Sequence, residues 1–173
     1  MQPMTVVADP ATAHGLLLVA ALFLPVGGVL LSLLLGGRAA ERIALGLLPV
    51  GLAVAMAITV VVLQANATLV YVLGGWQPPL GVALRADGLS AAMLLTTAVV
   101  ICGVGLFARA EFRTPAGVLE ARRPFAFWIL LLGVWAAMNA VFLGDDLFNL
   151  FVALELVTFA AVPLVSLDGR AET

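Results

Sequence analysis

The chain has 173 residues, of which 64% are hydrophobic and only 10% are charged, and its formal net charge is −2. Soluble domains carry about 25% charged residues, so this composition excludes an ordinary soluble protein and indicates an integral membrane protein. With one histidine, one cysteine, no phosphate-binding glycine loop and no cluster of metal ligands, the sequence gives no reason to expect a cofactor, a bound metal ion or a nucleic-acid partner.

Five apolar stretches are long enough to cross a bilayer as a helix, which takes about 20 residues. They cover residues 15–35, 43–63, 88–108, 124–143 and 147–167. Apart from Glu155 in the last stretch, none contains a carboxylate or an arginine. The sequence therefore predicts an all-α membrane protein with five transmembrane helices, forming a single membrane domain over residues 1–173.

All eight basic residues are arginines, and their distribution orients the predicted helices. If successive connecting segments alternate between the two sides of the membrane, seven arginines fall on one side and one on the other. Basic loops stay in the cytoplasm, so we expect the N-terminus outside and the C-terminus in the cytoplasm. The expected location is the inner (plasma) membrane of a bacterium, as a multi-pass protein.

The segment between the second and third helices has a pattern of its own on the predicted outer side. Residues 70–73 and 80–84 read as short extended runs on either side of a Gly/Pro-rich turn, which predicts a small hairpin. Trp76 would lie at the level of the lipid headgroups. Asp87 is expected to cap the N-terminus of the third helix.

Glu155 is the candidate functional residue, because it lies near the middle of a membrane-spanning stretch. Inserting a carboxylate at that depth costs about 2.5 to 3.5 kcal/mol, so such residues are usually covered by protein, paired and functional. Burial favours the neutral form of a carboxyl group, and a group that gains and loses a proton near neutral pH could serve as a proton relay. The alternative is a neutral glutamic acid that holds neighbouring helices together by hydrogen bonds.

Four further polar residues surround this candidate. Thr158 is the nearest hydrogen-bond partner on the same helix face. Asp145 and Asp146 lie at the start of the fifth helix, where they could cap it or gather protons or cations. Asn149 could bridge waters towards Glu155 or bond to another helix. On the fourth helix, Asn139 is interpreted as a structural residue that hydrogen-bonds to a neighbouring helix.

Three stretches of the chain resemble those of a known family. The run from Leu143 to Glu155, Leu-Gly-Asp-Asp-Leu-Phe-Asn-Leu-Phe-Val-Ala-Leu-Glu, resembles the Gly-Asp-Leu-Phe-Asn-Leu-Phe-Val-x-x-Glu signature of the proton-conducting antiporter-like family, with one extra aspartate. That family comprises the D-type subunits of Mrp-type Na+/H+ antiporters and antiporter-like subunits of respiratory complex I and related hydrogenases. The stretches Leu-Gly-Gly-Trp-Gln-Pro-Pro-Leu-Gly at 73–81 and Arg-Ala-Asp-Gly-Leu-Ser at 85–90 look like the family's outer hairpin and third-helix start.

The resemblance implies that Glu155 occupies the position of a glutamate that transfers protons. Family members pair it with a lysine on their seventh helix, within about fourteen helices that include two inverted repeats. The chain would then be the N-terminal portion of such a subunit. Its expected partners are the lipid bilayer, other membrane subunits, a chain supplying the missing helices, and protons, with Na+ as a candidate second ion. Two alternatives stay open: a membrane-arm subunit of a quinone oxidoreductase or hydrogenase, which leaves enzymatic activity undecided, and a non-conducting scaffold or inactive fragment.

Overall fold

Five long helices make up most of the protein. The computed structural model describes residues 5–7, 13–76, 81–112 and 121–167. The helices are α1 (Ala13–Leu35), α2 (Gly37–Ala65), α3 (Gly88–Glu111), α4 (Arg122–Leu143) and α5 (Leu147–Ser166). All five are long and apolar enough to cross a membrane, which confirms the five predicted stretches. Residues 77–80 of the predicted turn, Arg113 and the tail 168–173 lie outside the described residues.

The helices extend past the apolar stretches where polar residues continue the helical backbone. α2 begins at Gly37, six residues earlier than its apolar stretch, so Arg38 and Arg42 belong to its first turns. α3 runs on to Glu111 and carries Arg109 in its last turn. A charged residue at a helix end can reach the headgroup region, so the helix can be longer than the apolar stretch that hydropathy identifies.

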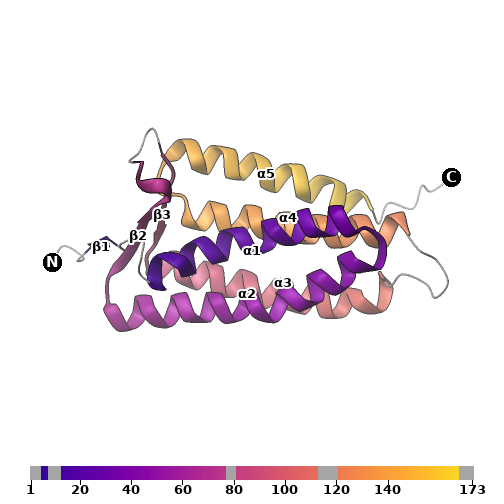
Figure 1. Cartoon of the computed structure of the whole chain (residues 1–173), viewed down its shortest axis with the longest axis horizontal. Coiled ribbons are helices and arrows are strands. Elements are labelled where there is room, and N and C mark those ends of the chain that lie inside the picture. Colours follow the sequence, from indigo (N-terminus) through magenta and orange to yellow (C-terminus); the bar gives the residue numbers. More distant parts are fainter. Residues whose placement is uncertain (1–4, 8–12, 77–80, 113–120, 168–173) are drawn as a thin grey trace.

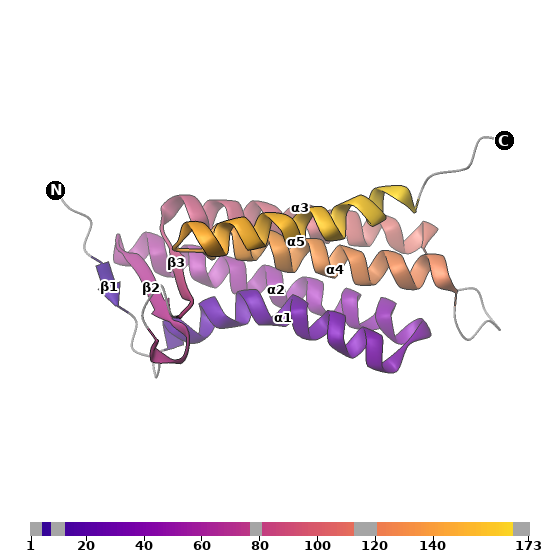
Figure 2. The same cartoon turned by 90° about the horizontal axis from the view of Figure 1, so that it is seen from above.

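The helices run alongside one another as an elongated bundle (Figure 1). The main contacts join α1 to α2, α2 to α3, α1 to α4 and α4 to α5. Since α5 packs chiefly on α4, it lies at the edge of the bundle, along the top in Figure 1 and in front of α3 and α4 in Figure 2, which is seen from above. A small sheet covers one end, and the α1–α2 turn lies at the opposite end.

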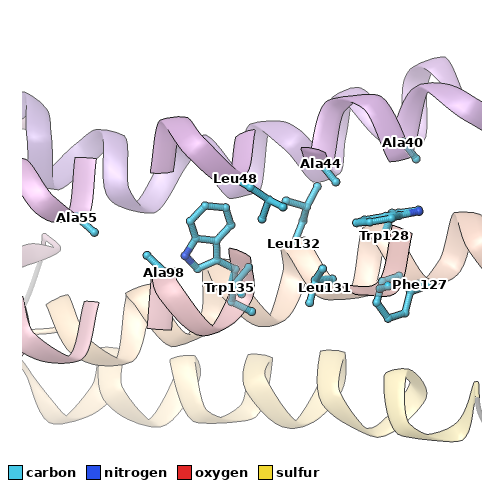
Figure 3. Close-up of a cluster of buried hydrophobic side chains, with 12 residues drawn as sticks. Ala40, Ala44, Leu48, Ala55, Ala98, Phe127, Trp128, Leu131, Leu132 and Trp135 are labelled. Carbon is cyan, nitrogen blue, oxygen red and sulfur yellow. The ribbon is translucent and has the colours of Figure 1, made fainter. Parts of the chain in front are cut away.

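Close packing depends on small residues at the helix interfaces. The buried positions of α2 recur every three or four residues and are mostly small: Ala40, Ala44, Leu48, Gly51, Ala55, Ile58 and Val62. α3 has a similar stripe of Ala91, Leu94, Ala98, Ile101, Gly105 and Ala108. Small residues let membrane helices approach closely, since apolar burial gives no driving force between helices in lipid. Large side chains of α4, including Trp128, Leu132 and Trp135, fill the space beside these stripes (Figure 3).

The sheet at the end of the bundle has three strands in the order β1 (Thr5–Val7), β2 (Thr68–Val72) and β3 (Ala83–Ala86). β1 pairs with β2 in parallel, and β2 pairs with β3 in the antiparallel sense. Leu69 and Leu84 of the sheet are buried in the apolar cluster at this end of the helices. The protein is mostly helical, as expected, and the strands add to that expectation: β2 and β3 lie between α2 and α3, and β1, which no sequence pattern indicated, lies before α1. Pairing in a sheet gives partners to backbone groups outside the helices.

Candidate functional site

The turn from α4 into α5 is capped by Asp146. Its Oδ1 accepts a hydrogen bond of 2.8 Å from the backbone N–H of Asn149, and the side-chain amide of Asn149 donates to Oδ2 of the same carboxylate. The predicted capping role is therefore confirmed for Asp146. The Asn149 amide bonds within its own helical turn. Of the two roles considered for it, the bond to another helix is not seen among the described residues, and the water bridge towards Glu155 stays a prediction.

Asp145 has a different role from its neighbour. Its Oδ1 lies 3.6 Å from a guanidinium nitrogen of Arg85, and both side chains are partly exposed. Leu84 beside Arg85 forms an isolated antiparallel bridge with Gly144. The α4–α5 turn is thus attached to strand β3 by a backbone bridge and an ion pair. The sequence around Arg85 and the sequence around Asp145 gave no indication of this link.

Glu155 is the ninth residue of the 20-residue helix α5. With a rise of 1.5 Å per residue, it lies about 12 Å from the start of a helix roughly 30 Å long, close to the middle of a bilayer's apolar core. Its side chain is exposed on the bundle surface, in a shallow open depression lined by Phe151, Leu154, Thr158 and Phe159. Within this chain the carboxyl group is therefore not enclosed by helices, in contrast to the burial that the sequence predicted, because α4 covers only the opposite face of α5.

The carboxyl group of Glu155 has no partner within the described part of the chain. Thr158, the predicted partner, donates its hydroxyl proton to the carbonyl of Leu154 at 3.1 Å. No ion pair or side-chain hydrogen bond of Glu155 occurs among residues 13–76, 81–112 and 121–167. Those same residues contain no group of three or more His, Cys, Asp or Glu that could hold a metal ion.

The apolar surface around Glu155 is extensive. Phe148, Phe151 and Phe159 are 75%, 59% and 81% exposed, and only Ala153 and Ala160 of α5 are buried. An acidic group in a broad apolar face at mid-membrane depth can exchange a proton only where a second group or water reaches it. Within the described residues, the surroundings of the Glu155 carboxyl group are apolar apart from Thr158.

Asp87 caps α3 as predicted. Its side chain accepts a hydrogen bond of 2.9 Å from the backbone N–H of Ser90. This bond holds the pKa of the Asp87 carboxyl below its usual value, against a smaller opposing effect of burial, and the guanidinium of Arg85 acts in the same direction as the bond. Asp87 and Arg85 therefore lie close together where the sheet meets α3.

Asn139 is the polar contact between helices that the sequence predicted. It is 4% exposed, and its Nδ2 donates to the carbonyl oxygen of Ala21 in α1 at 2.7 Å. Pro25 lies inside α1 and has no N–H, so the Ala21 carbonyl, four residues earlier, lacks its usual helical partner. Pro25 was the available signal that a donor from another helix was needed here.

Comparison with known proteins gives a consistent set of relatives. The chain is 35% identical over 129 residues to the D-type subunit of the Na(+)/H(+) antiporter of Alkalihalophilus pseudofirmus, a match that covers 75% of this chain and 25% of the relative. It is 36% identical over 97 residues to the corresponding Na(+)/H(+) antiporter protein of Bacillus subtilis, covering 56% of this chain and 18% of the relative. It is also 31% identical over 103 residues to the N-type subunit of the NADH-quinone oxidoreductase of Desulforudis audaxviator, covering 58% and 19%. No family model matches the chain.

A solved structure shares the fold. A chain of the membrane-bound sulfane sulfur reductase, an archaeal respiratory membrane complex, superposes with a TM-score of 0.74 at 22% identity, covering 90% of this chain and 31% of the other. The chain spans about a quarter or less of the length of the three curated relatives above. With five membrane-spanning helices and these relatives, the protein is a multi-pass membrane protein. The chain is therefore a homologue of the antiporter-like membrane subunits, the family that includes the D-type subunits of Na+/H+ antiporters and the N-type subunit of NADH-quinone oxidoreductase.

Proposed function

We propose that this chain forms part of a proton-translocating subunit of a multisubunit cation/proton antiporter in the bacterial plasma membrane, and that Glu155 is its mid-membrane proton relay. The observation that carries the proposal is the position of Glu155: an acid about 12 Å along α5, on a face that the described residues leave uncovered. The homology to two D-type antiporter subunits supplies the class of complex.

The cost of exposing Glu155 to lipid supports protein partners on that face. A carboxylate in contact with lipid at this depth costs about 2.5 to 3.5 kcal/mol, which a covering helix with a basic or polar group would remove. The aligned part of this chain covers only 18% and 25% of the two antiporter relatives. The remaining segments of those relatives are therefore available to cover such a face. We therefore propose that further membrane helices, from other subunits or from a longer chain, pack on α5 and complete the relay.

The test is proton movement driven by sodium in vesicles that contain the assembled complex. Glu155→Gln keeps the size and hydrogen bonding of the side chain but cannot release a proton at physiological pH, so transport should fall to background. Glu155→Asp keeps the acid and shortens its reach, so partial transport is expected. Glu111→Gln makes the same chemical change at the exposed end of α3 and should transport at the wild-type rate.

Assembly is measured separately on a native gel, so that loss of the complex is distinguished from loss of the relay. A Glu155→Gln complex that assembles and transports normally would show that Glu155 is structural, and the scaffold interpretation would replace the relay. The same experiment with a redox substrate in place of sodium tests the second candidate below.

The proposed orientation has the sheet end outside and the end that carries Arg38, Arg42 and Arg109 in the cytoplasm, on the basis of the arginine distribution. Cysteine labelling tests it in intact cells that carry Cys102→Ala to remove the native thiol. A cysteine at Trp76, which is 67% exposed at the sheet end, should react with a membrane-impermeant maleimide. A cysteine at Arg42, which is exposed at the other end, should not react, and the reverse pattern would invert the proposed topology.

A membrane-arm subunit of a quinone oxidoreductase or a related redox complex is the second candidate. It is favoured by the 31% identity to an N-type subunit of NADH-quinone oxidoreductase. Purification of the native complex distinguishes the two: co-purifying flavin or iron–sulfur subunits would support the redox complex, and small membrane subunits without redox centres would support the antiporter.

A further inference from the structure

The break in α1 at Pro25 brings a buried amide into the interior of the bundle. The Asn139 Nδ2 group replaces the N–H that Pro25 lacks and donates to the Ala21 carbonyl at 2.7 Å. A carbonyl can only accept, so this bond fixes which end of the amide faces α1. The amide oxygen, Oδ1, must therefore point to the other side.

Oδ1 of Asn139 is buried and has no hydrogen-bond partner among the described residues. Asn139 is one of the residues that line a small, largely enclosed cavity with room for about one water molecule. Helices α1 to α4 all contribute to its wall, which is apolar except near Asn139 and Trp135: Leu24, Pro25, Gly51, Ala55 and Leu94 line the rest. A residue that lines a space of this size and carries a buried, unpaired acceptor is a usual setting of an ordered internal water.

Trp135 provides the second polar group. Its indole N–H is a donor with no acceptor capacity. The ring lines the same cavity, and in Figure 3 its nitrogen lies on the edge nearer Ala98, one turn along α3 from the cavity residue Leu94. A water in the cavity could thus donate to one group and accept from the other.

We propose that the cavity is a binding site for a single structural water, which donates to Oδ1 of Asn139 and accepts from the indole N–H of Trp135. Together with the bond from Nδ2 to Ala21, the water completes a polar cross-link between α1 and α4 at a point where α1 has lost a helical hydrogen bond. Membrane helices tolerate proline when neighbouring helices and ordered waters satisfy the freed backbone groups, and this site uses both. The inference does not depend on the role of Glu155.

The test is a density map of the assembled membrane complex, at a resolution where other buried waters are seen. The wild type should show a peak within hydrogen-bond distance of both Asn139 Oδ1 and Trp135 Nε1. Asn139→Leu keeps a side chain of similar size without the acceptor, so the peak should disappear. An empty cavity in the wild type, or an unchanged peak in Asn139→Leu, would overturn the proposal.

If Asn139→Leu fails to assemble, a second pair of variants tests whether the water occupies this cavity. Ala55→Val fills the cavity from α2 and should remove the water peak. Ala53→Val makes the same change two residues away, at an exposed position, and should leave the peak in place. A peak that persists in Ala55→Val, or that is lost in Ala53→Val, would contradict a water held in this cavity.

Discussion

Gly51 provides the sharpest test of how α2 and α4 pack. It is buried in the middle of α2, and a Cβ atom at this position would overlap Cη2 and Cζ2 of the Trp135 ring. A glycine to alanine change in a helix normally gains about 1 kcal/mol from backbone propensity. Here the overlap with a packed indole should cost about 1 to 3 kcal/mol, so that Gly51→Ala ranges from neutral to destabilising by about 2 kcal/mol.

Gly46→Ala is the matched control on the same helix. A Cβ at Gly46 would have no atom within 4 Å, so this variant should gain the propensity term alone. The propensity terms cancel between the two variants, and the difference of about 1 to 3 kcal/mol isolates the overlap with Trp135. For a chain of this size that corresponds to about 2 to 12 °C in Tm, on the scaling for soluble domains.

Thermal unfolding in a mild detergent, followed by tryptophan fluorescence, measures the difference. In a Trp135→Phe background the shorter ring leaves room for the new methyl group, so Gly51→Ala should lose most of its penalty. If Gly51→Ala unfolds at the same temperature as Gly46→Ala, or above it, the indole does not pack against Gly51 and the α2–α4 contact is wrong.

Three further predictions concern aspartates near the helix N-termini. Asp146→Ala should destabilise the first turn of α5 by about 0.5 to 2 kcal/mol, seen as faster hydrogen exchange at the amide of Asn149. Asp145→Ala should cost less than about 1 kcal/mol, since it loses only a partly exposed ion pair with Arg85; a larger loss than for Asp146→Ala would show that the cap is wrongly assigned. The pKa of Asp87 is lower in the folded chain than in the unfolded chain, so its carboxylate contributes stability above the unfolded pKa that is lost as the pH falls through the folded one. The Tm advantage of the wild type over Asp87→Asn should therefore shrink between about pH 5 and pH 3, and a constant difference would exclude this linkage.

The sequence predicted the features that depend on local pattern and missed those that depend on distant contacts. Helix positions follow from apolar length, and the Asp87 cap follows from a side chain one position before a helix. Strand β1 has only three residues and pairs with residues more than sixty positions away, so no local signal marks it. The bond between Asn139 and Ala21 was predicted only as a contact with some other helix, because the sequence does not show which carbonyl accepts a hydrogen bond from an amide side chain.

The candidate site shows the same division. The sequence correctly placed Glu155 in the middle of a membrane-spanning helix, but it predicted burial where the chain leaves the side chain exposed. Hydropathy gives the depth of a residue in a span and says little about which helix face is covered. Whether α5 is covered depends on neighbours other than α4, and hydropathy does not show where those neighbours lie. The resemblance of residues 143–155 implied that such neighbours exist but not which face of α5 they cover.

The bond between Asn139 and Ala21 also has a consequence for the order in which the protein is built. The two residues are 118 positions apart, so at about 5 to 20 residues per second the acceptor is synthesised roughly 6 to 24 s before its donor. During that interval α1 is complete and carries a carbonyl that its own helix cannot satisfy. During early membrane insertion of α1, the Ala21 carbonyl must therefore bond to water or to the insertion machinery. In a nascent chain stopped after α3, this carbonyl should still lack its partner from α4.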